Sequence, residues 1–163
     1  MIKDAYERKI RRFRVTGLFA FDLLREYPDI QIFTGFPLPV CNSYAVRELA
    51  ALHAAKIQGW LELEREALND LIGKSVLPVE IYRYGRPPLL ATRAHIAADG
   101  EIKDIRNNRF VIKENRYTHI TALYPKNVFS IPRLPGAADY YDLSNANWNA
   151  KEIENFNFEN SLM

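Results

Sequence analysis

Residues 79–93 read VEIYRYGRPPLLATR and mark the point at which the predicted fold changes. The stretch begins as a strand, because valine, isoleucine and tyrosine favour extended backbone. It breaks at the GRPP segment of residues 85–88 and resumes as a second strand over residues 89–92. Proline fixes its φ angle and cannot donate a hydrogen bond to a sheet, so this turn is stiff. The guanidinium groups of Arg86 and Arg93 flank the second strand.

Strands and helices alternate on the amino-terminal side of this stretch. The predicted strands cover residues 13–17, 30–34, 56–60 and 77–84. Segments with apolar residues at helical spacing lie between them, over residues 18–27, 44–54 and 61–72. Such βα units build a parallel sheet, in which functional groups gather at the carboxyl ends of the strands.

Four strands of this kind admit two α/β architectures. An eight-stranded barrel takes about 250 residues, whereas this chain has 163. The first architecture is therefore a partial, half TIM-like βα barrel that is the C-terminal part of a longer protein or half of an assembly. The second is a small parallel sheet. A half barrel leaves two open sheet edges, so its expected partner is the remaining barrel half or a second copy of the chain.

The carboxyl-terminal side of the stretch has a different character. Short strands are predicted over residues 89–92, 109–113, 118–123 and 128–131, with turn signals at residues 99–100 and 107–108. This pattern predicts a small antiparallel β extension. Residues from 139 onward are rich in asparagine and aromatic residues and are expected to form short helical turns. The predicted domains are thus residues 1–84, 85–134 and 135–163.

Composition excludes several classes of protein. Hydrophobic residues make up 48% of the chain and charged residues 26%, which is typical of soluble globular proteins. A net charge of +2 does not indicate a nucleic-acid partner. No apolar run approaches the roughly 20 residues of a membrane span. The single cysteine, Cys41, excludes an internal disulfide framework and fits a reducing cytoplasm, where we expect the protein to reside.

Two polar side chains in the loops after predicted strands are candidate site residues. The amide of Asn42 could bind a substrate carbonyl or carboxylate, but it could equally cap the helix that follows. Glu62 follows the third strand and is the candidate general base. The alternative for Glu62 is a favourable interaction with the dipole of its own helix.

Arg86 and Arg93 are the candidate substrate-binding cations. A guanidinium group can hold a carboxylate or phosphate through two parallel hydrogen bonds. The alternative is structural ion pairing with Glu80, Glu101 or Asp104. The residue types alone do not decide between the two roles.

The remaining reactive residues do not form a catalytic set. His53, His95 and His119 are not spaced as metal ligands, and His95 is the best placed for chemistry because it follows Arg93 at a strand end. Cys41 has no neighbouring cation that would lower its pKa, so we interpret it as a small buried residue. The motifs of nucleotide-binding proteins and serine hydrolases are absent. We therefore predict neither a metal nor a cofactor.

Four passages, in order, resemble the collagenase-like peptidase family, the U-thirty-two peptidases. They are PLPVCNS (37–43), ELEREAL (62–68), VEIYRYGRPPLL (79–90) and IKDIRNNRFV (102–111). The third resembles the family's Gly-Arg-x-Pro-Leu-Met signature, and the resemblance runs from about residue 14 to residue 144. It implies the C-terminal portion of a larger protein with a barrel-like α/β core, a β extension and peptide or protein substrates.

The resemblance implies a peptidase-like hydrolase in which Glu62 activates water and Asn42, Arg86 and Arg93 orient the substrate. Some relatives instead support hydroxylation of RNA or of a quinone precursor and carry an iron–sulfur cluster on four cysteines. The corresponding segment here, residues 94–100, contains no cysteine. The other alternative is a non-catalytic binding or scaffold module that completes a barrel with another segment.

Overall fold

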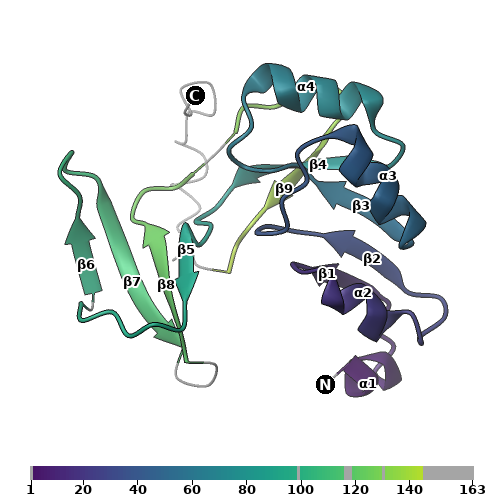
Figure 1. Cartoon of the computed structure of the whole chain (residues 1–163), viewed down its shortest axis with the longest axis horizontal. Helices are drawn as coiled ribbons and strands as arrows, with labels where there is room; N and C mark the ends of the chain where they lie inside the picture. Colours follow the sequence, from purple (N-terminus) through teal and green to yellow (C-terminus); the bar gives the residue numbers. More distant parts are fainter. Residues whose placement is uncertain (1, 99, 116–118, 130, 145–163) are drawn as a thin grey trace. The chain divides into compact units, whose positions relative to one another are not determined.

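The computed structural model describes residues 2–98, 100–115, 119–129 and 131–144. The chain divides into two compact units. Of the described residues, the first unit contains residues 2–82 and Arg133–Tyr140, and the second contains Arg83–Pro132 and residues 141–144. Each unit contains a sheet of its own (Figure 1). The predicted boundaries at residues 84 and 134 stay predictions.

The first unit is built from alternating strands and helices, as predicted. After α1 (Ile2–Glu7) come β1 (Arg12–Val15), α2 (Phe19–Leu24), β2 (Gln31–Thr34), α3 (Ser43–Ala51), β3 (Ala54–Gln58), α4 (Arg65–Lys74) and β4 (Val79–Tyr84). The pairs β1–β2, β2–β3 and β3–β4 are all parallel. Strand β9 (Ala138–Tyr141) extends the sheet beyond β4, giving the order β1-β2-β3-β4-β9. The predicted parallel α/β sheet is confirmed.

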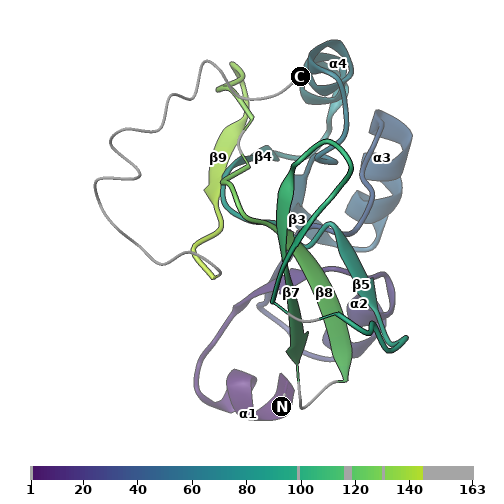
Figure 2. The ribbon, with the colours of Figure 1, turned by 90° about the vertical axis from the view of Figure 1, so that its left-hand side faces the viewer.

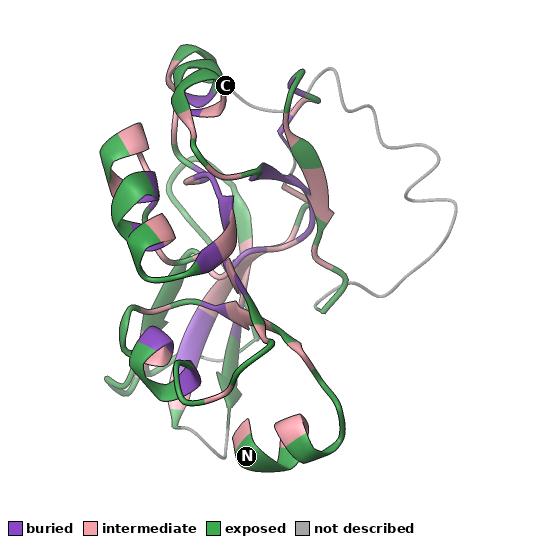
Figure 3. Cartoon of the chain, turned by 90° about the vertical axis from the view of Figure 1, so that its right-hand side faces the viewer, coloured by how far each residue is buried: buried purple, intermediate pink, exposed green. Residues whose placement is uncertain are grey.

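Helices α2, α3 and α4 lie on one side of this sheet (Figure 3). Right-handed crossovers between strands in sequential order place successive helices on the same face. The core forms where that face meets the helices, with Ile32 and Ile57 from the strands and Leu49 and Leu68 from the helices all buried. Close packing continues at Gly59, where an added Cβ would lie 3.2 Å from the Leu68 side chain.

Both boundaries of α4 differ from the prediction, and α2 and α3 each end three residues earlier than predicted. Helix α4 begins at Arg65 rather than at residue 61, because the chain first makes a turn closed by the Leu63 N–H donating to the Trp60 carbonyl at 3.3 Å. The helix also continues through Gly73 to Lys74. The Lys74 ammonium pairs with Asp70 at 2.6 Å, which favours this last turn.

The second unit contains a four-stranded antiparallel sheet. Its strands are β5 (Leu90–Thr92), β6 (Gly100–Lys103), β7 (Arg109–Asn115) and β8 (Ile120–Pro125), in the order β5-β8-β7-β6. All three pairings are antiparallel. The predicted antiparallel β extension is confirmed.

Three local predictions for this half of the chain are wrong. Gly100, predicted as a turn residue, begins β6. The predicted strand over residues 128–131 is reduced to an isolated bridge between Phe129 and Gly85. Residues 139–141 lie in β9 rather than in a helical turn. The helical turns predicted beyond residue 144 fall outside the described residues.

No helix in the described part of the chain is long and apolar enough to cross a membrane.

Candidate functional site

The sheet face opposite the helices in the first unit carries charged side chains. The strand register aligns Arg14 with Phe33 and Phe33 with Lys56, and it aligns Gln58 with Glu80. Aligned residues of neighbouring strands project to the same face, as do residues two apart on one strand. These five side chains therefore share the face that the helices do not cover, which we call the polar face.

A three-charge cluster lies at the centre of the polar face. The Glu80 carboxylate accepts from Arg14 Nη2 at 2.6 Å and pairs with Lys56 Nζ at 3.2 Å. Only 10% of the Glu80 side chain is exposed, against 26% for Arg14 and 30% for Lys56. Desolvating ions is costly unless their geometry and hydrogen bonding are good. Burying these three charged groups therefore costs free energy, and the short contacts between them offset that cost.

Arg14 is held in place from several directions. Its Nη1 donates to the Thr34 carbonyl oxygen at 2.7 Å, and its guanidinium carbon lies 4.2 Å from the centre of the Tyr140 ring. An added Cβ on Gly35 would lie 2.8 Å from the Arg14 Cδ atom. Because Gly35 has no side chain, the aliphatic part of Arg14 can pack against it. These contacts hold the guanidinium group near the carboxyl end of β1.

Gln58, the last residue of β3, has a side-chain donor without a partner among the described residues. The side chain is 2% exposed, and its Oε1 accepts from the Phe36 N–H at 2.7 Å. Its backbone N–H donates to Thr34 Oγ1 at 3.0 Å. The amide Nε2 is buried and makes no hydrogen bond with the described residues. An unmet buried donor costs about 1–3 kcal/mol, so this nitrogen is a candidate contact for a ligand.

Aromatic side chains lie beside Gln58 at the carboxyl ends of β2 and β3. The rings of Phe36 and Trp60 stack with their centres 5.0 Å apart and their planes at 25°. The backbone N–H of Trp60 donates to the Val40 carbonyl at 3.1 Å, which connects the two loops. The buried amide of Gln58 and this stacked aromatic pair therefore lie at the same end of the sheet.

The two predicted site residues of the first unit lie in loops after β2 and β3. Asn42 is exposed and caps α3, because its Oδ1 accepts from the Ala45 N–H at 2.9 Å. It also lines a groove with Cys41 and Arg47. Glu62 is exposed in the turn before α4. Asn42 therefore caps a helix, as one of its two interpretations expected. Glu62 lies in the turn before α4 and not in the first turn of the helix itself.

The two predicted arginines belong to the second unit. Arg86 is half-buried and its Nε atom is buried, whereas Arg93 is exposed directly after β5. The carboxylates considered as their partners make other contacts: Glu80 binds Arg14 and Lys56, and Glu101 binds Lys126 at 2.6 Å. Because Arg86 and Arg93 lie in a different unit from Asn42 and Glu62, a single rim formed by all four residues stays a prediction.

Sequence reasoning missed Arg14, Lys56 and Gln58, although a local signal was present. A parallel sheet covered by helices on both faces has nearly continuous apolar strands. Here the strands RFRV of β1 and AAKIQ of β3 alternate between apolar and polar residues. That alternation indicates a second face that is polar.

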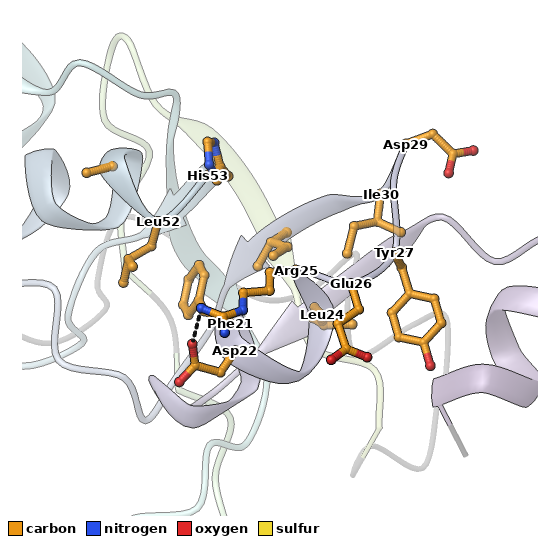
Figure 4. Close-up of a pocket in the computed structure, with 12 residues that line it drawn as sticks. Phe21, Asp22, Leu24, Arg25, Glu26, Tyr27, Asp29, Ile30, Leu52 and His53 are labelled. Carbon is orange, nitrogen blue, oxygen red and sulfur yellow. Dashed lines mark ion pairs between the residues drawn. The ribbon is translucent and has the colours of Figure 1, made fainter.

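An apolar hollow of the first unit lies elsewhere. It has a volume of about 630 Å³ and lies beside α2, lined by Phe21, Leu24 and Leu52 with His53 at its edge (Figure 4). The Asp22–Arg25 ion pair at its rim, 3.4 Å long, is exposed. No group of three or more His, Cys, Asp or Glu side chains arranged to bind a metal occurs among the described residues.

Comparisons with family models, with curated proteins and with solved structures found no match for this chain. The resemblance to the collagenase-like peptidases therefore stays a prediction from the sequence.

Proposed function

We propose that the chain is the substrate-binding part of a peptidase-like hydrolase similar to the collagenase-like peptidases. The observation that carries this proposal is the Nε2 of Gln58, which is buried without a partner in the described part of the chain and lies on the same sheet face as the cations. Ligands of open α/β sheets bind at the carboxyl ends of the strands. Gln58 is the last residue of β3 and Arg14 is the third of the four residues of β1, so the cluster lies in that region.

In this proposal the polar face binds a peptide backbone. The amide of Gln58 donates a hydrogen bond to a substrate carbonyl, and the ammonium of Lys56 stabilises negative charge that develops on that oxygen. Arg14 and Lys56 share the Glu80 carboxylate, which fixes both cations. Glu62, in the turn after β3, acts as the general base that activates water.

Peptide hydrolysis by the full chain tests the role of Glu62. General bases contribute about 10²- to 10⁴-fold to rate, so we expect Glu62→Gln to lower kcat by about that factor. Glu64→Gln is the matched control, because Glu64 is also exposed, lies two residues away and makes no capping hydrogen bond with its side chain. Equal rates for the wild type and both variants on a set of fluorogenic peptides would contradict the role of Glu62.

The second candidate function is a non-catalytic module that completes a barrel with another segment. It is favoured by the exposed apolar side chains of Leu18, Phe19 and Leu23 around α2, which follows β1, the terminal strand of the sheet. Phe19 is 73% exposed. Light scattering tests this candidate: association that Phe19→Glu abolishes would support it, and a monodisperse monomer at all concentrations would count against it.

A further inference from the structure

One face of the antiparallel sheet in the second unit gathers cations. The register aligns Lys103 with Arg109, and it aligns Glu101 with Val111 and Val111 with Tyr124. Aligned residues of antiparallel strands share a face. We call this the basic face and define it as Lys103, Arg109, Lys113, Tyr124 and Lys126 around Glu101. Strands β5, β7 and β8 lie side by side in Figure 2.

Contacts at Glu101 show that the cations are close together. Lys126 Nζ lies 2.6 Å from one carboxylate oxygen, and Arg109 Nη1 lies 3.5 Å from the other. The hydrogen bond from Lys126 lowers the pKa of Glu101, and attraction by Lys126, Arg109 and Lys103 lowers it further against the opposing effect of desolvation. Three cations are thus within electrostatic reach of one carboxylate.

The basic face retains a large excess of positive charge. Its four cations and one carboxylate give a net charge of +3, whereas the whole chain has +2. The cations are accessible, since 51% of the Arg109 side chain and 41% of the Lys126 side chain are exposed. The opposite face of the sheet carries Ile102, Phe110 and Ile112, which are half-buried or buried. The basic face is therefore the solvent side of the sheet.

The chemistry of the face favours an acidic peptide over a nucleic acid. Sheets that bind single-stranded nucleic acid offer aromatic rings on which bases stack. Among the described residues of the basic face only Tyr124 is aromatic, and the Lys113 ammonium lies over its ring, 5.7 Å from the centre. Arg109 and Lys113 are four residues apart on β7, about 13 Å at the rise of a strand. In an extended peptide, every second side chain points to the same face, so acidic residues at alternating positions include pairs that are also four residues apart.

We propose that the basic face binds an extended peptide segment with acidic residues at alternating positions. Arg109 and Lys113 contact carboxylates along the peptide, and Lys103 and Lys126 add contacts on the neighbouring strands. Glu101 limits the attraction by neutralising part of the charge. This interaction is separate from the hydrolysis proposed above and does not depend on it.

Fluorescence anisotropy with the full chain tests the proposal. The probes are a labelled (Glu-Thr)₅ peptide, the uncharged (Gln-Thr)₅ peptide and a ten-nucleotide oligothymidylate. We expect the acidic peptide to bind at least about tenfold more tightly than the uncharged one at low salt and to weaken as salt is added. Binding of the oligothymidylate more tightly than (Glu-Thr)₅, or equal binding of the two peptides, would overturn the proposal.

Paired variants locate the interaction. We expect Lys103→Gln with Lys113→Gln to weaken (Glu-Thr)₅ binding by about fivefold or more, as loss of two exposed charge contacts predicts. Lys3→Gln with Lys9→Gln removes two exposed lysines from the first unit and is expected to leave affinity unchanged. Glu101→Gln is expected to strengthen binding. Equal losses in both double variants, with unchanged thermal unfolding, would show that net charge alone drives binding and would refute the assignment to this face.

Discussion

Each of the two charged clusters described above has one glutamate between two cations, but the glutamates differ in how far they are buried. In the first unit, Glu80 lies between Arg14 and Lys56 with 10% of its side chain exposed. In the second unit, Glu101 lies between Arg109 and Lys126 with 39% exposed. Exposed ion pairs contribute little because water screens them, whereas loss of one member of a buried pair leaves an uncompensated charge. Burial, rather than the number of pairs, therefore sets the energetic importance of each cluster.

The difference in burial also suits the two clusters to different roles. The first cluster is rigid, because Arg14 additionally binds the Thr34 carbonyl and contacts the Tyr140 ring. Groups held in this way suit the binding of a substrate, as the function proposed above requires. The second cluster keeps most of its cations accessible and suits attraction of a partner in solution.

The largest effect is expected from Glu80→Gln. This change leaves Arg14 and Lys56 partly buried without their shared carboxylate, and breaking a buried pair typically costs about 3–5 kcal/mol. We expect the free energy of unfolding in urea to fall by about that amount. Glu101→Gln is the matched control, and a decrease for it as large as that for Glu80→Gln would break the comparison between the two clusters.

A smaller loss of stability is expected from Gly35→Ala. The new Cβ would lie 2.8 Å from Arg14 Cδ, and the arginine stem cannot retreat without weakening the bond to Glu80. Overpacking of this kind costs about 1–3 kcal/mol. Gly73→Ala in α4 is the control with the opposite sign, because an added Cβ there meets no atom within 4 Å and alanine favours a helix by about 0.5–1 kcal/mol. Urea unfolding of both variants checks the pair.

The sequence predicted the parallel sheet because each βα unit is a local pattern. Apolar runs, the capping residue Asn42 and the helical stripe with Leu49 all lie within a few residues of each other. The antiparallel extension was also predicted, although β6 was missed because Asp99-Gly100 is a strong turn signal and the strand GEIK is short. Strand β9 was missed because it pairs with β4, far away in the sequence.

The polar face could not be assembled from the sequence for a related reason. Arg14 and Glu80 are 66 residues apart, and they meet only because four strands take one register. Local patterns report which face of its own strand a residue occupies, but they do not report which residue of another strand lies beside it. Asn42 and Glu62 were found because they lie in the loops that follow strands, whereas Gln58 lies inside the predicted strand over residues 56–60.

The smallest expected effect on stability is the pH dependence that the exposed Glu101 cluster contributes. It tests how the exposed cluster differs from the buried one. Contacts with Lys126, Arg109 and Lys103 lower the pKa of Glu101 from its ordinary value of 4.5. A carboxyl whose pKa is lower in the folded state stabilises the fold above its unfolded pKa, and this contribution is lost as the pH falls through its folded pKa. We therefore expect urea unfolding of the wild type and of Glu101→Gln to differ slightly at pH 6 and to converge as the pH falls from about 4.5 through the lower folded pKa.

A difference between these two proteins that persists unchanged at pH 3 would contradict the assignment of the effect to the ionised carboxylate. Carboxyl NMR of Glu101 gives a second measurement, in which the Lys126→Gln variant should move the pKa of Glu101 back toward its ordinary value. Because Lys126 supplies the largest cause of the lowered pKa, a larger shift from Arg109→Gln than from Lys126→Gln would reverse the order of contacts derived for the basic face. The exposed cluster would then be organised around Arg109 rather than around the hydrogen bond from Lys126.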